Sequence, residues 1–190
     1  MSNAPAKKEP GMASLVIVLA LICLVIAALL GLVNSVTKAP IAANTEKTVQ
    51  DSLKIVMPAD SYDKVDYTGG DVTTDNGVVV PVVAVYQAGE EGYVVETNSP
   101  NGFGGALDMM AGISADGKVT GIAIISHAET SGLGSKATEP EWQAQFKDAE
   151  GIVKVEKDGG SIESITGSTI TSRAVCDGVN AARLVVESLG

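Results

Sequence analysis

The sequence predicts an α+β fold, in which one N-terminal membrane helix precedes an antiparallel sheet with helices packed against it. Three observations support this prediction. A long apolar run lies near the N-terminus, valine-rich segments separated by glycine turns fill the middle, and apolar residues recur at helical spacing near the C-terminus. The chain has 190 residues, enough for one ordinary domain and a short appendage.

Composition excludes two classes of protein. Hydrophobic residues make up 45% of the chain and charged residues 19%, which is incompatible with a disordered polymer. The 13 basic and 23 acidic side chains give a formal net charge of −10. Nucleic-acid phosphates require clustered cations, so we expect no nucleic-acid partner.

Residues 12–33 carry no charge and predict a transmembrane anchor. As a helix they would span about 33 Å, close to the thickness of a bilayer core. A signal peptide cleaved near Ala39 to Ala43 is the alternative, but the apolar run is longer than such peptides need and Pro40 interrupts the region. A lipoprotein signal is disfavoured because Cys23 follows Ile22 rather than a small residue.

Charge on the two sides of the anchor predicts its orientation. Lys7 and Lys8 favour a cytoplasmic N-terminus for residues 1–11, although Lys38 and Lys47 weaken the asymmetry. Residues 35–190 carry 11 basic and 22 acidic side chains, and such a surface repels anionic headgroups. We expect a single-pass protein of the bacterial cytoplasmic membrane, with its main domain outside the cytoplasm.

Residues 34–60 are expected to form a juxtamembrane helical connection that stops at Met57-Pro58. The domain itself is assigned to residues 61–190. Residues 62–97 are rich in Val, Tyr and Thr and predict several strands, and Asn76-Gly77 is typical of a hairpin turn.

A second hairpin is predicted from residues 107–114 and 118–126, which flank the turn at 115–117. Gly102, Gly104 and Gly105 precede it and indicate a close approach of backbone segments or a bend.

Two helices are predicted after the strands. Residues 139–147 place Trp142 and Phe146 one turn apart on a short amphipathic helix. A closing helix of about 16–18 residues is expected near the C-terminus, with Thr171 or Ser172 as its cap. Cys176 falls within it and is expected to be a buried apolar residue rather than a reactive thiol.

The segment from Ser161 to Ser172 gathers hydroxyl side chains around Gly167. Helix capping explains one such residue. A glycine turn that leads into a helix N-terminus also aims backbone N–H groups at an anion, and phosphate is the obvious candidate. The Gly-Lys-Ser/Thr ending of a nucleotide-binding loop is absent, so capping and anion binding both remain open.

Residues 163–172 resemble the flavinylation motif of the FMN-binding domain family, Asp-x-x-(Ser/Thr)-Gly-Ala-(Ser/Thr)-x-(Ser/Thr)-Ser. Here Glu163 replaces the usual Asp and Ser168 the usual Ala. The resemblance implies a covalent phosphoester between FMN and Thr169. It also implies cofactor contacts from the rest of the motif: Thr166, Gly167, Ser168, Thr171 and Ser172.

A second segment, residues 126–134, resembles the His-x-Glu-Thr-Pro-Gly-Leu-Gly signature of the same family, with Ser131 in place of Pro. Glycines suit a loop whose backbone approaches a flat ligand. The glycine turn at 101–105 is also similar to the family's. The cofactor contacts implied by the second segment are His127, Glu129, Thr130, Gly132, Leu133 and Gly134.

His127 is the single histidine of the chain. A serine hydrolase is excluded because no Gly-x-Ser-x-Gly motif is present, and we expect no metal site because histidine and cysteine partners are lacking. Orienting the flavin-side loop by a hydrogen bond and a purely structural role remain open.

The anchor and the two motifs together are similar to the G subunits of Rnf complexes, which pass electrons between ferredoxin and NAD⁺ and move Na⁺ or H⁺. The resemblance implies an electron relay that works with the membrane, iron–sulfur and flavin subunits and is loaded from FAD by a flavin transferase. The chain has no dinucleotide fingerprint and no cluster-binding cysteines, so it is not expected to be a complete enzyme alone.

Three other assignments are considered. The equivalent subunit of a Na⁺-translocating NADH:quinone reductase is disfavoured by length. A membrane-anchored FMN-binding or sensory module would use the same fold without joining a pump, and sequence separates it poorly from the relay. A structural subunit without a cofactor would leave the hydroxyl cluster unexplained.

Overall fold

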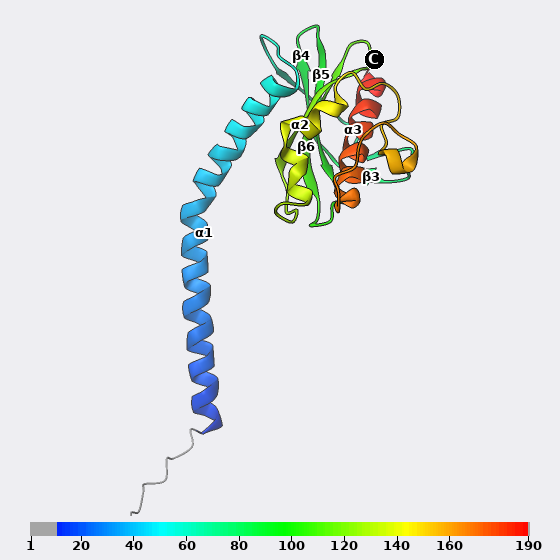
Figure 1. Cartoon of the computed structure of the whole chain (residues 1–190). Coiled ribbons are helices and arrows are strands. Elements are labelled where there is room, and N and C mark those ends of the chain that lie inside the picture. Colours follow the sequence, from blue (N-terminus) through cyan, green and yellow to red (C-terminus); the bar gives the residue numbers. More distant parts are fainter. Residues whose placement is uncertain (1–10, 190) are drawn as a thin grey trace, which may run out of the picture. The chain divides into compact units, whose positions relative to one another are not determined.

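The computed structural model describes residues 11–189, which fall into two compact units with their division after Glu46 (Figure 1). The predictions made for residues 1–11, including the cytoplasmic placement of Lys7 and Lys8, lie outside the described residues except for Gly11. The first unit is helical. The second unit contains the sheet and the remaining helices, and it confirms the predicted α+β fold.

Helix α1 runs from Met12 to Val56. Its portion Met12–Lys38 is long and apolar enough to cross a membrane, as residues 12–33 predicted. The helix continues through Pro40, so the predicted anchor and juxtamembrane segment form one element, which ends just before Met57.

The main sheet is antiparallel throughout, in the order β1-β4-β5-β6-β7. Its strands are β1 Asp63–Val65, β4 Val82–Ala88, β5 Gly92–Ser99, β6 Leu107–Ser114 and β7 Val119–Ser126. The hairpin predicted around residues 115–117 joins β6 to β7, and Gly117 occupies its left-handed position at φ +82°. The predicted hairpin is therefore confirmed.

A separate two-stranded sheet pairs β2 Val72–Thr73 with β3 Val79–Val80. The turn between them contains Asn76-Gly77, and Gly77 has φ +75°. A residue with a side chain adopts this conformation at a steric cost, which explains why the Asn-Gly pair marked the turn correctly.

Each face of the main sheet has its own apolar core. Helix α3 Thr169–Leu189 lies along β5 and β6 (Figure 1) and buries one cluster, which includes Met109, Val175 and Val179. The last turn of α1 covers the other face with Leu53, Val56 and Met57. The sheet is thus held between two helices, and α1 ends inside the domain's own core.

Two glycines let the end of α1 approach the sheet. A Cβ on Gly112 would overlap the Thr120 hydroxyl and lie 2.9 Å from Val56 Cγ1, and one on Gly121 would lie 3.1 Å from the Val56 carbonyl oxygen. The Thr120 hydroxyl donates to that carbonyl at 2.7 Å. The hydrogen bond satisfies one of the last carbonyls of the helix, which have no partner within it.

The helices after the sheet differ from the prediction in extent. Residues 139–147 form only α2 Pro140–Gln143 and the 3₁₀ turn η2 Ala144–Phe146, although the rings of Trp142 and Phe146 do pack edge to face at 5.2 Å. Two further 3₁₀ turns, η1 Gly134–Thr138 and η3 Glu156–Asp158, were not predicted.

The predicted cap of the closing helix is wrong. Helix α3 has 21 residues and begins at Thr169, so Thr171 and Ser172 lie inside its first turn. The carbonyl of Ser168 accepts the backbone N–H of Ser172 at 3.1 Å, which makes Ser168 the capping residue. Four of the five residues 168–172 carry a hydroxyl group, so the sequence alone does not indicate which of them caps the helix.

We predict that Gly112→Ala lowers the free energy of unfolding by about 1–3 kcal/mol, because the new methyl group overpacks the contact with Val56. Denaturant unfolding of the full chain in detergent measures the change. Gly31→Ala is the matched control, since an added Cβ there meets no atom within 4 Å. Equal stability of the two variants would contradict the packing described here.

Candidate functional site

A pocket of about 350 Å³ lies at the N-terminal end of α3, within the usual size range of small-molecule sites. Segments far apart in the sequence form it: the glycine turn, the 126–134 loop, η3 and the motif at 163–172. Its lining residues are Phe103, Thr130, Leu133, Lys157, Gly167, Ser168, Thr169 and Ile170. The structure therefore brings the three segments that resemble the FMN-binding family to one place.

The start of α3 supplies polar groups to the pocket. Gly167 turns the chain with φ +79°, and Thr169 follows as the first helical residue with a half-buried side chain. The first N–H groups of a helix have no partner within it and carry partial positive charge. The position therefore favours an anionic ligand next to Thr169.

The buried carboxylate of Glu129 links the three segments. Its Oε2 accepts a hydrogen bond from the Thr171 hydroxyl at 2.9 Å, and its Oε1 accepts one from the Gly104 backbone N–H at 3.3 Å. Thr171 is in turn 2.8 Å from the Ser168 hydroxyl. One side chain thus ties the 126–134 loop to both the glycine turn and the first turn of α3.

Glycines make room for this carboxylate. A Cβ on Gly134 would overlap Glu129 Oε2, one on Gly102 would lie 2.6 Å from Oε1, and one on Gly104 would overlap the Ala128 carbonyl. The predicted close approach of backbone segments is confirmed.

Several predicted site residues do not line the pocket. His127 Nδ1 accepts the backbone N–H of Glu129 at 3.1 Å, and the Gly132 N–H donates to the Ser135 hydroxyl at 2.8 Å, so both residues shape their own loop. The Ser172 hydroxyl is buried between the Ile165 N–H and the Ser168 carbonyl. Thr166 is exposed in a separate surface depression.

The beginning of the motif is held by its backbone. Trp142 Nε1 donates to the Glu163 carbonyl at 2.8 Å, and the Glu163 N–H donates to Gln145 Oε1 at 2.8 Å. The short helices α2 and η2 thus hold the backbone of Glu163 by hydrogen bonds, and its side chain remains exposed. The acid that replaces the family's Asp therefore makes no contact in the pocket.

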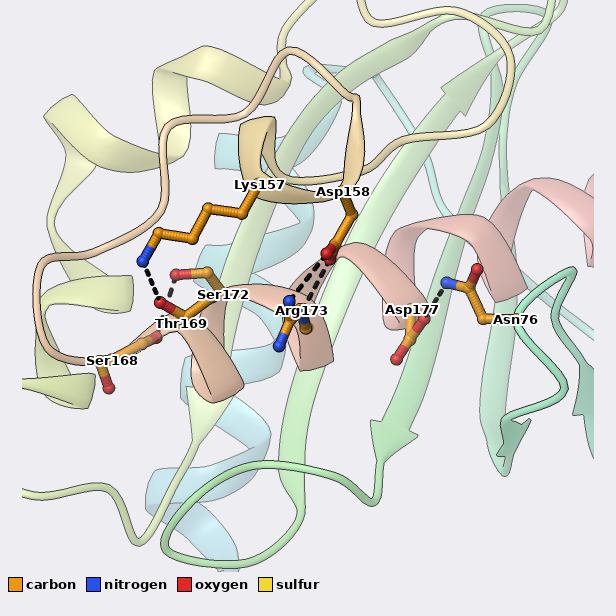
Figure 2. A network of polar contacts seen from close by, with 8 residues as sticks. All are labelled: Asn76, Lys157, Asp158, Ser168, Thr169, Ser172, Arg173 and Asp177. Carbon is orange, nitrogen blue, oxygen red and sulfur yellow. Dashed lines mark hydrogen bonds and ion pairs between the residues drawn. The ribbon is translucent and has the colours of Figure 1, made fainter.

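Lys157 is a pocket residue that sequence reasoning missed. Its Nζ donates a hydrogen bond to Thr169 Oγ1 at 2.8 Å, and Figure 2 shows the two side chains pointing toward each other. Lys157 lies twelve positions before Thr169. The one local signal is the Gly159-Gly160 pair two positions after it. This pair predicts a tight turn, but it does not predict the direction of the lysine side chain.

Asp158 follows Lys157 and pairs with Arg173 of α3. Arg173 Nε and Nη2 each donate to one Asp158 carboxylate oxygen at 2.7 Å. These hydrogen bonds hold the pKa of Asp158 below its usual value. The fork geometry of the guanidinium defines the orientation of the carboxylate.

Cys176, on the same helix, is buried, as predicted from the sequence. It is 3% exposed, and burial raises its pKa to about 12, so the thiol stays protonated and unreactive near neutral pH. Among residues 11–189, moreover, no three His, Cys, Asp or Glu side chains come together as a metal site would require.

Comparison with known proteins gives two family matches. Residues 102–183 match the FMN-binding domain family, and residues 11–56 match the RnfG N-terminal region. The first match contains the glycine turn, the 126–134 loop and the start of α3, and the second coincides with α1.

Among relatives, the G subunit of the ion-translocating oxidoreductase complex of Methanosarcina acetivorans is 34% identical over 174 residues, 88% of this chain and 90% of that one. The G subunit of the proton-translocating ferredoxin:NAD⁺ oxidoreductase complex of Clostridium ljungdahlii is 34% identical over 75% of each chain. Its counterpart in the Na⁺-translocating complex of Acetobacterium woodii is 46% identical over 105 residues, 52% of this chain and 50% of that one. Among solved structures, Shewanella oneidensis NqrC aligns with 65% of this chain and 70% of its own at 16% identity, with a TM-score of 0.46.

We predict that Glu129→Ala lowers the free energy of unfolding by about 1–3 kcal/mol, because Thr171 Oγ1 and the Gly104 N–H lose a buried partner. Glu129→Gln, which keeps an acceptor oxygen, should lose less. Denaturant unfolding gives the energies, and Glu141→Ala, at an exposed position, is the control. A Glu129→Ala variant as stable as the control would refute the linking role of the carboxylate.

Proposed function

The chain belongs to the family of ion-translocating oxidoreductase complex G subunits, and on that premise we propose that it carries FMN and relays electrons within such a membrane complex. The proposal takes the ferredoxin:NAD⁺ oxidoreductase activity from the names of the relatives. The remaining support comes from the pocket at the start of α3.

The residues of the pocket fit FMN. Phe103, Leu133 and Ile170 are 68%, 45% and 49% exposed and supply apolar surface on which a flat ring can lie. Thr169, the Lys157 ammonium and the N-terminus of α3 add a cationic and hydrogen-bonding environment to the same pocket. Together these groups provide apolar surface for the ring of FMN and hydrogen-bond donors for its phosphate.

The hydroxyls of residues 168–172 differ in accessibility, and this observation carries the proposed phosphoester. Ser168, Thr171 and Ser172 are each at most 7% exposed and hydrogen-bonded inside the fold. Thr169 is half-buried, lines the pocket and faces the Lys157 ammonium. Thr169 is therefore the attachment point that a flavin phosphate can reach.

The chain's own contribution to the relay is to hold the cofactor and tune its surroundings. FMN, when bound, supplies the redox chemistry. A phosphoester removes dissociation of a flavin that works outside the cytoplasm, and the helix N-terminus favours the charge that remains on the phosphate. The loop tied by Glu129 contributes Thr130 and Leu133 to the wall of the pocket.

Electrons must enter and leave through partners. We propose the other Rnf subunits as donor and acceptor, and a flavin transferase that uses FAD for maturation. Residues 12–37 contain no charged side chain, so ion movement is assigned to other subunits. The portion Met12–Lys38 of α1 is the proposed single-span anchor, and the charge pattern of the sequence supports placing the FMN-binding domain on the extracytoplasmic side.

Three other assignments have less support. A sensory module would use the same pocket, and the corresponding subunit of a Na⁺-translocating NADH:quinone reductase would have a similar domain. The relatives aligned over three quarters or more of this chain are G subunits, which favours the Rnf assignment. A structural subunit without a cofactor would leave the exposed apolar side chains of the pocket without a role.

We predict that the chain, co-expressed with the flavin transferase, gains the mass of one FMN less one water and gives a fluorescent band on a denaturing gel. Thr169→Ala should abolish both signals with little change in unfolding temperature. The matched control is Ser168→Ala, which removes the neighbouring hydroxyl and should keep the label. Persistent label in Thr169→Ala, or its loss in Ser168→Ala, would contradict the assignment.

We also predict that protease added to right-side-out vesicles digests the chain beyond residue 34, because the domain faces outward. In inverted vesicles the same residues should be protected until detergent is added. Immunoblotting with an antibody against the C-terminus follows the digestion. Digestion of inverted vesicles alone would show the opposite topology.

A further inference from the structure

The contact between Lys157 and Thr169 requires that other residues hold the Lys157 side chain in position. A lysine side chain has a flexible stem, and ordering it costs conformational entropy. Lys157 is exposed and lies on η3, a single 3₁₀ turn of three residues. Such a turn holds a long side chain in one place only if the turn itself is fastened.

Two sets of contacts fasten η3. On one side, the Glu156 N–H donates to the Ile162 carbonyl at 2.9 Å, and the Ile162 N–H donates to the Lys154 carbonyl at 3.1 Å. On the other side, the Asp158 carboxylate takes both hydrogen bonds of Arg173. Gly159 closes the turn with φ +82°. The loop is thus closed on itself and bridged to α3.

The bridge lies directly beside the acceptor. Arg173 follows Thr169 by four positions, so the two side chains share one face of α3. Lys157 and Asp158 are neighbours on η3, and they meet Thr169 and Arg173 respectively. Figure 2 shows both links between the turn and the first part of the helix. Because the two residues are neighbours, the ion pair that fixes Asp158 also fixes the position of Lys157 relative to Thr169.

An exposed ion pair contributes little to stability, and Arg173 and Asp158 are 50% and 37% exposed. The main contribution of the ion pair is therefore to the relative position of η3 and α3 and not to the free energy of unfolding. A bidentate arginine fixes both the distance and the angle between η3 and α3, which a lysine at position 173 would not do.

We propose that Lys157 is the residue that promotes flavin attachment at Thr169, and that the Asp158–Arg173 ion pair positions it. This inference rests on the proposed function, since it concerns the formation of the same phosphoester. It adds roles for Lys157, Asp158 and Arg173, which lie outside both motif segments. Arg173 directly follows the segment 163–172.

In the attachment step, Thr169 Oγ1 bonds to the flavin-side phosphorus of FAD, the anhydride P–O bond breaks, and AMP leaves with the electron pair of that bond. The hydroxyl proton passes to a base of the flavin transferase, and no atom changes oxidation state. Because Lys157 donates to Oγ1, the hydroxyl proton is free to point toward that base. With FAD bound, the ammonium next to Oγ1 would also stabilise the negative charge that develops on the phosphorus-bound oxygens.

The test uses the full chain in detergent, purified flavin transferase and FAD, with the rate of labelling followed by gel fluorescence and intact mass. Lys157→Met should lower kcat at least about tenfold, as expected for loss of one hydrogen bond from a charged group, and should change the KM for the chain less than about twofold. Lys157→Arg should recover most of the rate. Arg173→Met should slow labelling about three- to tenfold by misplacing the lysine.

Two comparisons separate positioning from general damage. Arg183→Met breaks another ion pair of α3, with Glu187, and should leave the rate unchanged. In a Lys157→Met background, Arg173→Met should cause no further loss, because a residue that acts through the lysine has nothing left to position. Unfolding temperatures of all variants should stay close to that of the parent chain.

The outcomes are distinguishable. An unlabelled parent chain would overturn the proposed function itself. A labelled parent with Lys157→Met equally fast would overturn the role of the lysine, and so would failure of Lys157→Arg to recover activity. Independent losses from Lys157→Met and Arg173→Met, multiplying in the double variant, would overturn the positioning role of the ion pair.

Discussion

The buried carboxylate of Glu129 is the interaction on which the candidate site depends. Two loops and the first turn of α3, distant in sequence, meet because its two oxygens accept hydrogen bonds from Thr171 and Gly104. Burying a charge is costly unless it is hydrogen-bonded, so the arrangement persists only with these partners in place. The same bonds occupy the Thr171 hydroxyl, and Ser168 is bonded to it. The constraint that builds the pocket therefore also leaves the Thr169 hydroxyl accessible, while those of Ser168 and Thr171 are buried.

The sheet connects this site to the end of helix α1 within one folded unit. The start of α3 bears the pocket and packs on one face, and the last turn of α1 packs on the other through Val56 and its neighbours. A flavin held at Thr169 would thus be attached to a rigid sheet rather than to a flexible tether. Electron transfer between fixed partners benefits from such a defined position, because each cofactor is kept at constant distance from its neighbours.

The sequence predicted the elements whose signals are local. The apolar run at 12–33, the Asn76-Gly77 turn and the 115–117 hairpin each depend on nearby residues, and each is present. The start of α3 was missed because several hydroxyls competed for the cap, and the choice is made by the contact of Thr171 with Glu129, 42 positions away. Lys157 was missed for the same reason, since only the tertiary structure brings η3 against Thr169. Resemblance to a family located the motifs but not the basic side chain that faces them.

The most direct test of the central claim is peptide mapping of the mature chain, purified from cells that contain the flavin transferase. Trypsin cuts after Lys157 and Arg173, so one peptide, residues 158–173, carries every hydroxyl of the motif. We predict that this peptide gains the mass of FMN less water and that fragmentation assigns the addition to Thr169. An unmodified peptide from fully matured protein, or an addition on another residue, would contradict it.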